Sequence, residues 1–163
     1  MNTQASLLPV TRELVPEDQR LVITERLFGM AFPLQLEPVV YGITDRMTQD
    51  YTGGYWNFYT LSNGGFYMAP SEDRIFHVKC QNMYEGDLSA DALGITACLY
   101  AYSNLSFSLS DIAREYARHY HLLREYMVDH AEVEGNPGGD RLSSRGWGAT
   151  ARPAPGFCRN IRN

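Results

Sequence analysis

The spacing of apolar residues changes twice along the chain, from a helical period to an alternating one and back again. Residues 16–29 predict a first helix, because Pro16 and two acids open it and Gly29 ends it. Residues 38–49 predict a second helix. Its apolar positions recur at helical spacing: Val39, Val40, Ile43 and Met47.

The middle of the chain predicts strands. Residues 55–61 are aromatic and extended in character, and residues 66–69 follow a turn-forming Ser-Asn-Gly-Gly cluster. This arrangement predicts a β-hairpin that ends at Pro70. Residues 75–80 alternate between apolar and polar again. They predict a third, antiparallel strand, joined to the hairpin through the polar loop 71–74.

The helical period returns near residue 89. Ser89 is a candidate N-cap for a helix with few charges, which we expect to be substantially buried. Ser110 is the candidate cap of a last helix. The apolar stripe of that helix has helical spacing: Ile112, Tyr116, Tyr120, Leu123 and Met127. The order of elements predicts an α+β fold, in which a small antiparallel sheet of about three strands with a central hairpin packs with four or so helices.

Composition divides the 163 residues into three parts. A chain of this length suffices for one domain with a buried core, which we assign to residues 16–134. Residues 1–15 are expected to be a flexible N-terminus. Residues 135–163 contain six Gly, three Pro and five Arg with few apolar residues. We therefore expect a disordered Gly/Pro/Arg-rich tail.

The net charge of −5 is unevenly distributed. Residues 1–134 contain eighteen Asp and Glu against nine Lys and Arg, whereas residues 135–163 contain one acid and five Arg. An acidic body disfavours non-specific binding to DNA phosphates. Acids and arginines alternate within it, as at Asp111, Arg114 and Glu115. This alternation favours an ordinary solvated acidic surface over mimicry of DNA.

Cysteine use and hydropathy indicate a cytoplasmic protein. The odd count and wide spacing of Cys80, Cys98 and Cys158 give no disulfide framework, so reduced thiols are expected. The N-terminus lacks the apolar core of a signal peptide. No apolar run approaches the length of about 18 residues that a membrane-spanning helix needs, so we expect no membrane partner.

Neither the histidines nor the cysteines form a recognisable catalytic or metal site. His119 and His121 would point about 200° apart on a helix, so they cannot share a metal ion there. We expect solvent-facing or helix-end histidines, including His130. Cys80 and Cys98 fall on faces predicted to be buried, where a cysteine acts as a small hydrophobe. The sequence therefore predicts no catalytic residue, no metal and no cofactor.

Two glycine pairs flank the aromatic segment, at residues 53–54 and 64–65. Neither pair forms a phosphate-binding motif, so tight turns explain them better. Aromatic residues beside such turns can stack on nucleic-acid bases. The basic residues that should accompany base stacking are absent from the segment.

The run from Tyr51 to Pro70 resembles the signature of the ArdB/KlcA antirestriction family. The residues that carry the resemblance are Tyr51, Gly53, Gly54, Tyr55, Trp56, Phe58, Asn63, Gly64, Gly65, Phe66 and Pro70. Three further segments look like family motifs, at residues 26–29, 91–95 and 119–126. The resemblance covers roughly residues 20–130. The chain departs from the family pattern after Glu134, where an Ala-rich helical end would be expected.

The resemblance implies a bacterial antirestriction factor of plasmids and other mobile genetic elements, which helps mobile DNA evade type I restriction-modification. The resemblance does not settle how restriction is blocked. Our hypothesis is a factor that is neither an enzyme nor a DNA mimic, and whose partner is the host restriction machinery or an associated protein. Two alternatives remain: a small enzyme with an unrecognised polar site, and a DNA-associated binding module.

Three residues of the signature are candidate partner contacts. Tyr51, Trp56 and Asn63 are chosen because aromatic and polar loop residues often anchor partners. For Trp56, a place in the core is the stronger expectation. Asn63 is also expected to favour a turn with positive φ.

Overall fold

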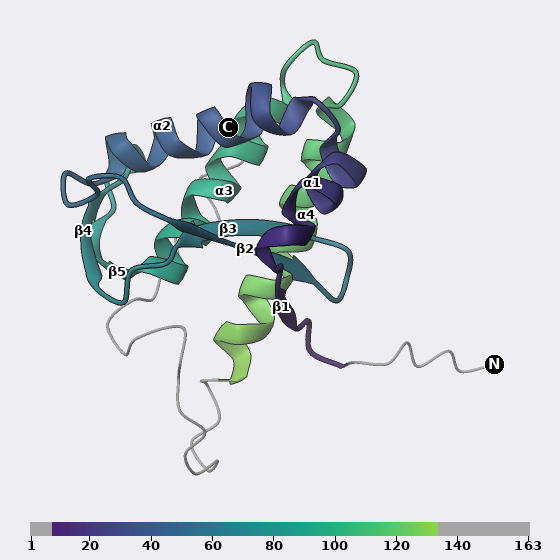
Figure 1. Cartoon of the computed structure of the whole chain (residues 1–163). Coiled ribbons are helices and arrows are strands. Elements are labelled where there is room, and N and C mark those ends of the chain that lie inside the picture. The colour runs from purple at the N-terminus through teal and green to yellow at the C-terminus, as the bar shows by residue number, and fades with distance from the viewer. Residues whose placement is uncertain (1–7, 134–163) are drawn as a thin grey trace.

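The computed structural model describes residues 8–133, and the side chains as far as residue 128. Five strands, four α-helices, a 3-10 turn η1 and a π-helix η2 make up this part of the chain (Figure 1). In chain order they are β1 (Arg12–Leu14), η1 (Glu17–Gln19), α1 (Arg20–Phe28), η2 (Phe32–Leu36), α2 (Glu37–Met47), β2 (Trp56–Leu61), β3 (Phe66–Pro70), β4 (Ile75–Lys79), β5 (Glu85–Ser89), α3 (Ala90–Ser106) and α4 (Ala113–Val133). The predicted α+β class is confirmed.

The main sheet has the order β1-β2-β3 and is antiparallel throughout. The hairpin is as predicted, with Phe58 opposite Met68. Its turn closes through a hydrogen bond from the Leu61 N–H to the Gly65 carbonyl oxygen, 2.8 Å. The hairpin therefore supplies two of the three strands, with β2 in the centre of the sheet and β3 at one edge.

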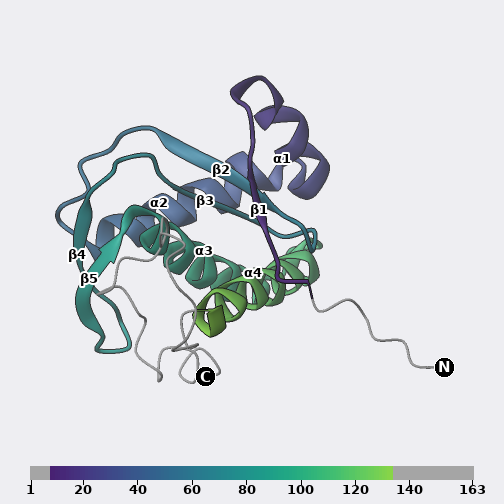
Figure 2. The same ribbon diagram turned by 90° about the horizontal axis from the view of Figure 1, so that it is seen from below.

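The predicted three-stranded meander is wrong in its third strand. β4 does not extend the hairpin but pairs with β5 in a separate two-stranded sheet, where Phe76 lies opposite Leu88. The missing strand of the main sheet comes from the N-terminal segment, since Arg12 of β1 lies opposite Leu61. α3 lies beside the other edge of β3 (Figure 2), so that edge has no room for β4.

The placement of β1 also corrects the expectation of a flexible segment over residues 1–15. Residues 12–14 form a paired strand, and the flanking Val10 and Val15 are buried. Residues 1–7 lie outside the described part of the chain, as does the tail expected at 135–163.

The helix boundaries follow local signals closely. α1 ends at Gly29, which has φ of 57°. Ser89 caps α3, because its hydroxyl oxygen accepts a hydrogen bond from the Ala92 N–H, 3.2 Å. α4 begins at Ala113 rather than at Ser110, whose carbonyl oxygen accepts a hydrogen bond from the Ala113 N–H. None of the helices within residues 8–133 is long and apolar enough to cross a membrane.

α3 is the central helix of the core, buried along most of its length between α4, α2 and β3. Its close approach to β3 depends on Gly94. A Cβ atom at this position would lie 2.3 Å from the Cβ of Ala69 and 2.5 Å from the Met68 carbonyl oxygen. The glycine therefore sets the distance between helix and strand.

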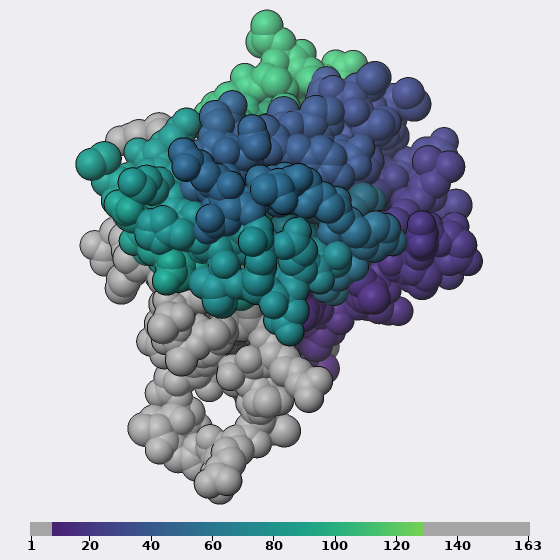
Figure 3. Space-filling model, turned by 60° about the vertical axis from the view of Figure 1, so that its left-hand side comes forward, coloured from purple at the N-terminus to yellow at the C-terminus, as the bar shows by residue number. Residues whose placement is uncertain are grey.

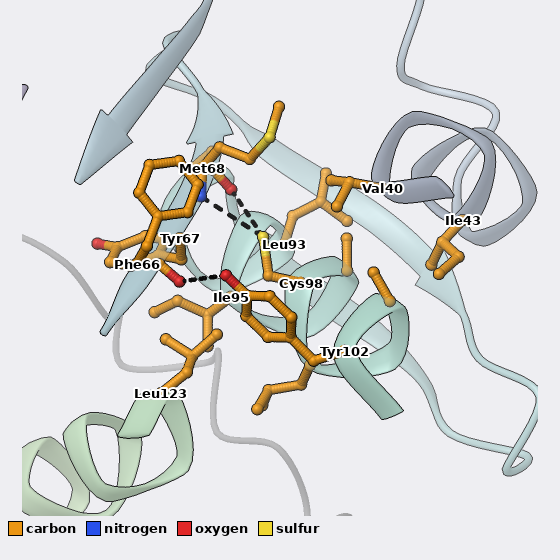
Figure 4. Close-up of a cluster of buried hydrophobic side chains, with 14 of the residues drawn as sticks. Val40, Ile43, Phe66, Tyr67, Met68, Leu93, Ile95, Cys98, Tyr102 and Leu123 are labelled. Atoms are coloured by element: carbon orange, nitrogen blue, oxygen red, sulfur yellow. Dashed lines mark hydrogen bonds between the residues drawn. The ribbon is translucent and has the colours of Figure 1, made fainter. Parts of the chain in front are cut away.

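Side chains of α3 also hydrogen-bond to the outer edge of β3 (Figure 4). The Met68 N–H donates to Cys98 Sγ at 3.4 Å, and the Cys98 thiol donates to the Met68 carbonyl oxygen at 3.5 Å. The Tyr102 hydroxyl donates to the Phe66 carbonyl oxygen at 2.8 Å. An edge strand whose backbone groups are satisfied in this way is unavailable for further strand pairing.

Candidate functional site

Most of the aromatic signature lies in the core. The side chains of Trp56, Phe58 and Phe66 are each at most 7% exposed. They cannot stack on nucleic-acid bases without unfolding. Tyr55 is 49% exposed, but the Arg20 guanidinium lies 4.6 Å from its ring centroid. The signature therefore contributes packing more than accessible surface.

The three candidate contact residues are separated by the structure. Tyr51 and Trp56 touch, since the Trp56 indole N–H donates to the Tyr51 hydroxyl oxygen at 2.7 Å. Trp56 is 3% exposed, in agreement with a core role, whereas Tyr51 is half-buried. Asn63 lies apart from this pair at the hairpin turn. A role of any of the three in binding a partner stays a prediction.

Asn63 connects the hairpin turn to α4. Its side-chain amide donates to the Leu122 carbonyl oxygen at 2.9 Å and lies 3.2 Å from a Glu125 carboxylate oxygen. Its Oδ1 accepts from the Gly65 N–H at 3.0 Å. The expected positive φ is wrong, because Gly64 has φ of 93° and Asn63 does not share that conformation. Asn63 therefore holds the hairpin turn against α4, while Gly64 provides the left-handed backbone conformation of the turn.

The histidines differ from expectation at one position. His121 is exposed, and so is His77, which lies between Asp87 and Glu85. These two acids raise the pKa of His77. His119 is fully buried instead, with its ring centroid 4.7 Å from that of Phe28. Burial, followed by the charge of Arg118, lowers the pKa of His119 to about 4.

Cys80 and Cys98 are both buried free thiols, as predicted. Burial raises the pKa of each, to about 12 for Cys98. A thiol with a raised pKa is a poor nucleophile at neutral pH. Within the described residues, no group of three or more His, Cys, Asp or Glu side chains is placed to hold a metal ion.

A cluster of polar side chains joins three elements that are distant in sequence. Arg12 of β1 forms an ion pair with Asp91, in the first turn of α3. Arg12 Nη1 also donates to the Tyr67 hydroxyl oxygen at 2.6 Å. The Tyr67 hydroxyl in turn donates to Asp91 Oδ1 at 2.8 Å. The three side chains form a closed triangle of hydrogen bonds.

Aromatic rings support this triangle. The Arg12 guanidinium carbon lies 4.6 Å from the ring centroid of Tyr59. The Tyr59 ring stacks on that of Tyr67, and the Tyr67 ring stacks on that of Tyr126, with centroid distances of 4.9 Å and 5.8 Å. Burial opposes the charge of Arg12, but contacts with Tyr67 and Asp91 raise its pKa above the usual value. The guanidinium therefore stays charged at all physiological pH values.

The cluster borders an open groove of about 640 Å³. We call it the Arg12 groove. Its lining consists of Arg12, Asn57, Tyr59, the segment 69–75 and the segment 89–91. Figure 3 shows the middle of the chain, in teal, at the surface of one face beside the purple N-terminal segment. The groove combines charged, hydroxyl and amide groups with apolar side chains, which are those of Ala69, Pro70, Ile75 and Ala90.

Sequence reasoning did not identify this groove. Arg12 belonged to a segment expected to be flexible, and an acid in the first turn of a helix is ordinary. Only the pairing of β1 with β2 places Arg12 beside Tyr59, and only the packing of α3 against β3 brings Asp91 to Tyr67. No periodic signal in the sequence links these positions.

Comparison with known proteins identifies the family. Residues 49–135 match the family model described as "Antirestriction protein". An antirestriction protein KlcA from Escherichia coli is 40% identical over 136 residues, covering 82% of this chain and 94% of the relative. An uncharacterised protein YafX from Escherichia coli K12 is 42% identical over 126 residues, covering 73% and 80%.

A solved structure agrees with these similarities in three dimensions. It superposes with a TM-score of 0.70 at 38% identity, covering 83% of this chain and 96% of the other. The solved structure is described as showing a novel fold for the KlcA and ArdB proteins, which have antirestriction activity against Type I DNA restriction systems in vivo but not in vitro. In sequence and in fold, therefore, the chain belongs to the antirestriction protein family of KlcA and ArdB.

Proposed function

We propose that this protein is an antirestriction factor that helps mobile DNA evade a host type I restriction-modification system. The observation that carries the proposal is similarity to KlcA over 94% of the relative's length. The solved relatives are described as active against Type I DNA restriction systems in vivo. The likeness extends well beyond the signature segment, to most of the relative's length.

The proposed mode of action is contact with a protein, without catalysis. The competing proposal of a small enzyme requires a polar cleft, and the Arg12 groove is the place where it would act. Against catalysis, burial and the Asp91 carboxylate raise the pKa of the Tyr67 hydroxyl beside the groove, so it stays protonated and is not available as a base or nucleophile at neutral pH. Cys98 faces the core and not the groove.

The proposal also differs from DNA mimicry. A mimic needs rows of uncompensated acids, whereas several acids here are paired with basic groups. Glu72 lies 2.7 Å from Arg74, and Glu115 lies 3.5 Å from Arg118. These pairs interrupt the negative surface and favour an ordinary acidic exterior.

We place the action in the bacterial cytoplasm, on the host restriction machinery or an associated protein. The relatives' activity in vivo but not in vitro favours a step that requires a cellular partner. A DNA-binding module would instead give salt-dependent gel shifts. From the acidic body of the protein we expect none.

The test is the plating of unmodified phage on a host with a type I restriction system. Cells that express the protein should plate the phage more efficiently than cells with an empty vector, and a restriction-deficient host should show no difference. A second form ending at Glu134 tests whether the basic residues 135–163 are needed. Unchanged plating with soluble, folded full-length protein would contradict the proposed function.

A further inference from the structure

The Arg12 guanidinium is held in place, but only one of its three nitrogen atoms donates hydrogen bonds to the residues that the structure describes. It stacks on Tyr59 and donates through Nη1 to Tyr67 and Asp91. Its other donors, Nε and Nη2, have no partner among the residues that the structure describes. The side chain is 29% exposed, and it lines the Arg12 groove. One edge of a fixed guanidinium is therefore available to a ligand.

The groove is lined by two arginines and three acids, so an anionic ligand is favoured by the free donors at the Arg12 edge and not by the net charge. Asp91 is already neutralised by Arg12, and Glu72 by Arg74. Asp73 is exposed at the rim, where water screens it. In addition, Ala90 and Asp91 line the groove at the N-terminus of α3, whose first N–H groups carry partial positive charge.

A cationic ligand fits this end of the groove less well. Asp91 Oδ2 is an acceptor without a partner within the described part of the chain, but it is buried. A cation in the groove could not reach that oxygen, because it is shielded from solvent. The groups without a partner at the Arg12 edge itself, Nε and Nη2, are donors.

We propose that the Arg12 groove binds a carboxylate side chain of a partner protein, with the free edge of the Arg12 guanidinium as its receptor. This inference rests on the proposed function, in which the target is a protein. A planar guanidinium matches a carboxylate through two parallel hydrogen bonds. The contacts with Tyr59, Tyr67 and Asp91 orient it beforehand, which lowers the entropy lost on binding. A nucleic-acid backbone, which brings a negative charge with every nucleotide, is disfavoured more than a single carboxylate because the body around this arginine is strongly acidic.

The direct test is an NMR titration of the ¹⁵N-labelled full chain at constant ionic strength. The probe is N-acetyl-glutamate amide, and the matched neutral probe is N-acetyl-glutamine amide. We expect saturable shifts of the Arg12 Nε–H and of the Ala90 and Asp91 amides with the glutamate probe alone. An absence of saturation, or equal shifts with the glutamine probe, would overturn the proposal. Tighter binding of inorganic phosphate than of the glutamate probe would overturn it too.

Two variants distinguish binding to the Arg12 guanidinium from non-specific attraction by positive charge. Arg12→Lys keeps the charge but loses the planar fork, and should bind the glutamate probe about tenfold more weakly. Arg26→Lys changes an arginine outside the groove and should bind as the wild type does. If Arg12→Lys binds as tightly as Arg26→Lys, the free guanidinium edge is not the receptor.

Phage plating then connects the groove to function. Arg12→Lys, with an unchanged NMR fold, should protect phage less well than Arg26→Lys. If wild type protects and Arg12→Lys protects equally, the groove does not hold the partner, while the proposed function stands. If wild type does not protect at all, the proposed function fails, whatever the titration shows.

Discussion

The thiol of Cys98 is bonded on both sides to the backbone of Met68, accepting from its N–H at 3.4 Å and donating to its carbonyl oxygen at 3.5 Å. A cysteine of α3 thus takes the place that a neighbouring strand would occupy beside β3. This contact explains why the sheet ends at β3 and why β4 pairs elsewhere.

Replacing Cys98 should therefore destabilise the fold through β3. Cys98→Ala leaves the Met68 N–H and carbonyl oxygen buried without partners, and should lower the free energy of unfolding by about 1–3 kcal/mol. Cys98→Ser retains a donor and an acceptor and should lose less. Urea unfolding of the two variants measures the difference. Equal losses would show that packing, and not the edge hydrogen bonds, determines the effect.

Gly94 offers a steric test of the same helix–strand contact. Gly94→Ala should destabilise by about 1–3 kcal/mol, because the new methyl group would overlap Ala69 and the Met68 carbonyl oxygen. Gly42→Ala is the matched control, since its Cβ would meet nothing within 4 Å in α2. The control should stabilise the protein by about 0.5–1 kcal/mol. Thermal and urea unfolding should move in opposite directions for the two variants, and a shared direction would contradict the prediction.

His119 should make stability depend on pH. Its pKa in the folded protein, about 4, lies below the value of 6.5 for a free histidine. The neutral ring is therefore favoured by folding: stability is complete above pH 6.5 and falls as pH decreases towards 4. Between pH 7.5 and pH 5 the wild type should lose about 2 kcal/mol from this residue.

The comparison that isolates this effect uses His119→Phe. Phe28 and Tyr102 already surround the ring with aromatic contacts, so phenylalanine fits the site chemically. Urea unfolding at the two pH values should show a smaller loss for the variant than for the wild type. The same pH dependence in both proteins would assign it to other groups.

Substitutions at Asn63 test whether the residue stabilises the contact with α4 or the conformation of the turn. Asn63→Ala should cost about 1 kcal/mol, because the hydrogen bond to the Leu122 carbonyl oxygen is lost. Asn63→Gly should cost at least as much, since the native residue does not use positive φ. Recovery of stability in the glycine variant would show instead that turn conformation matters most. Phage plating with the stable variants tests whether Asn63 contacts a partner.

The sequence by itself determined the elements that depend on near neighbours. Gly29 ends α1 and Ser89 caps α3, because each acts on backbone groups within one turn of itself. The β2–β3 hairpin follows from two extended, aromatic-containing segments on either side of a Ser-Asn-Gly-Gly turn cluster. The run from Tyr51 to Pro70 identified the family for the same reason, since its composition can be recognised without any knowledge of packing.

Only the tertiary structure decided which distant segments meet. β1 is three residues long, too short for a periodic signal, and it forms because Leu61 and its neighbours offer an open edge far along the chain. The stripe of α4 does not reveal that His119 lies inside, because Phe28 and Tyr102 come from two other helices. The Arg12–Tyr67–Asp91 triangle has the same origin. Each of its members is ordinary in its own segment, and their chemistry arises from contacts that no local pattern encodes.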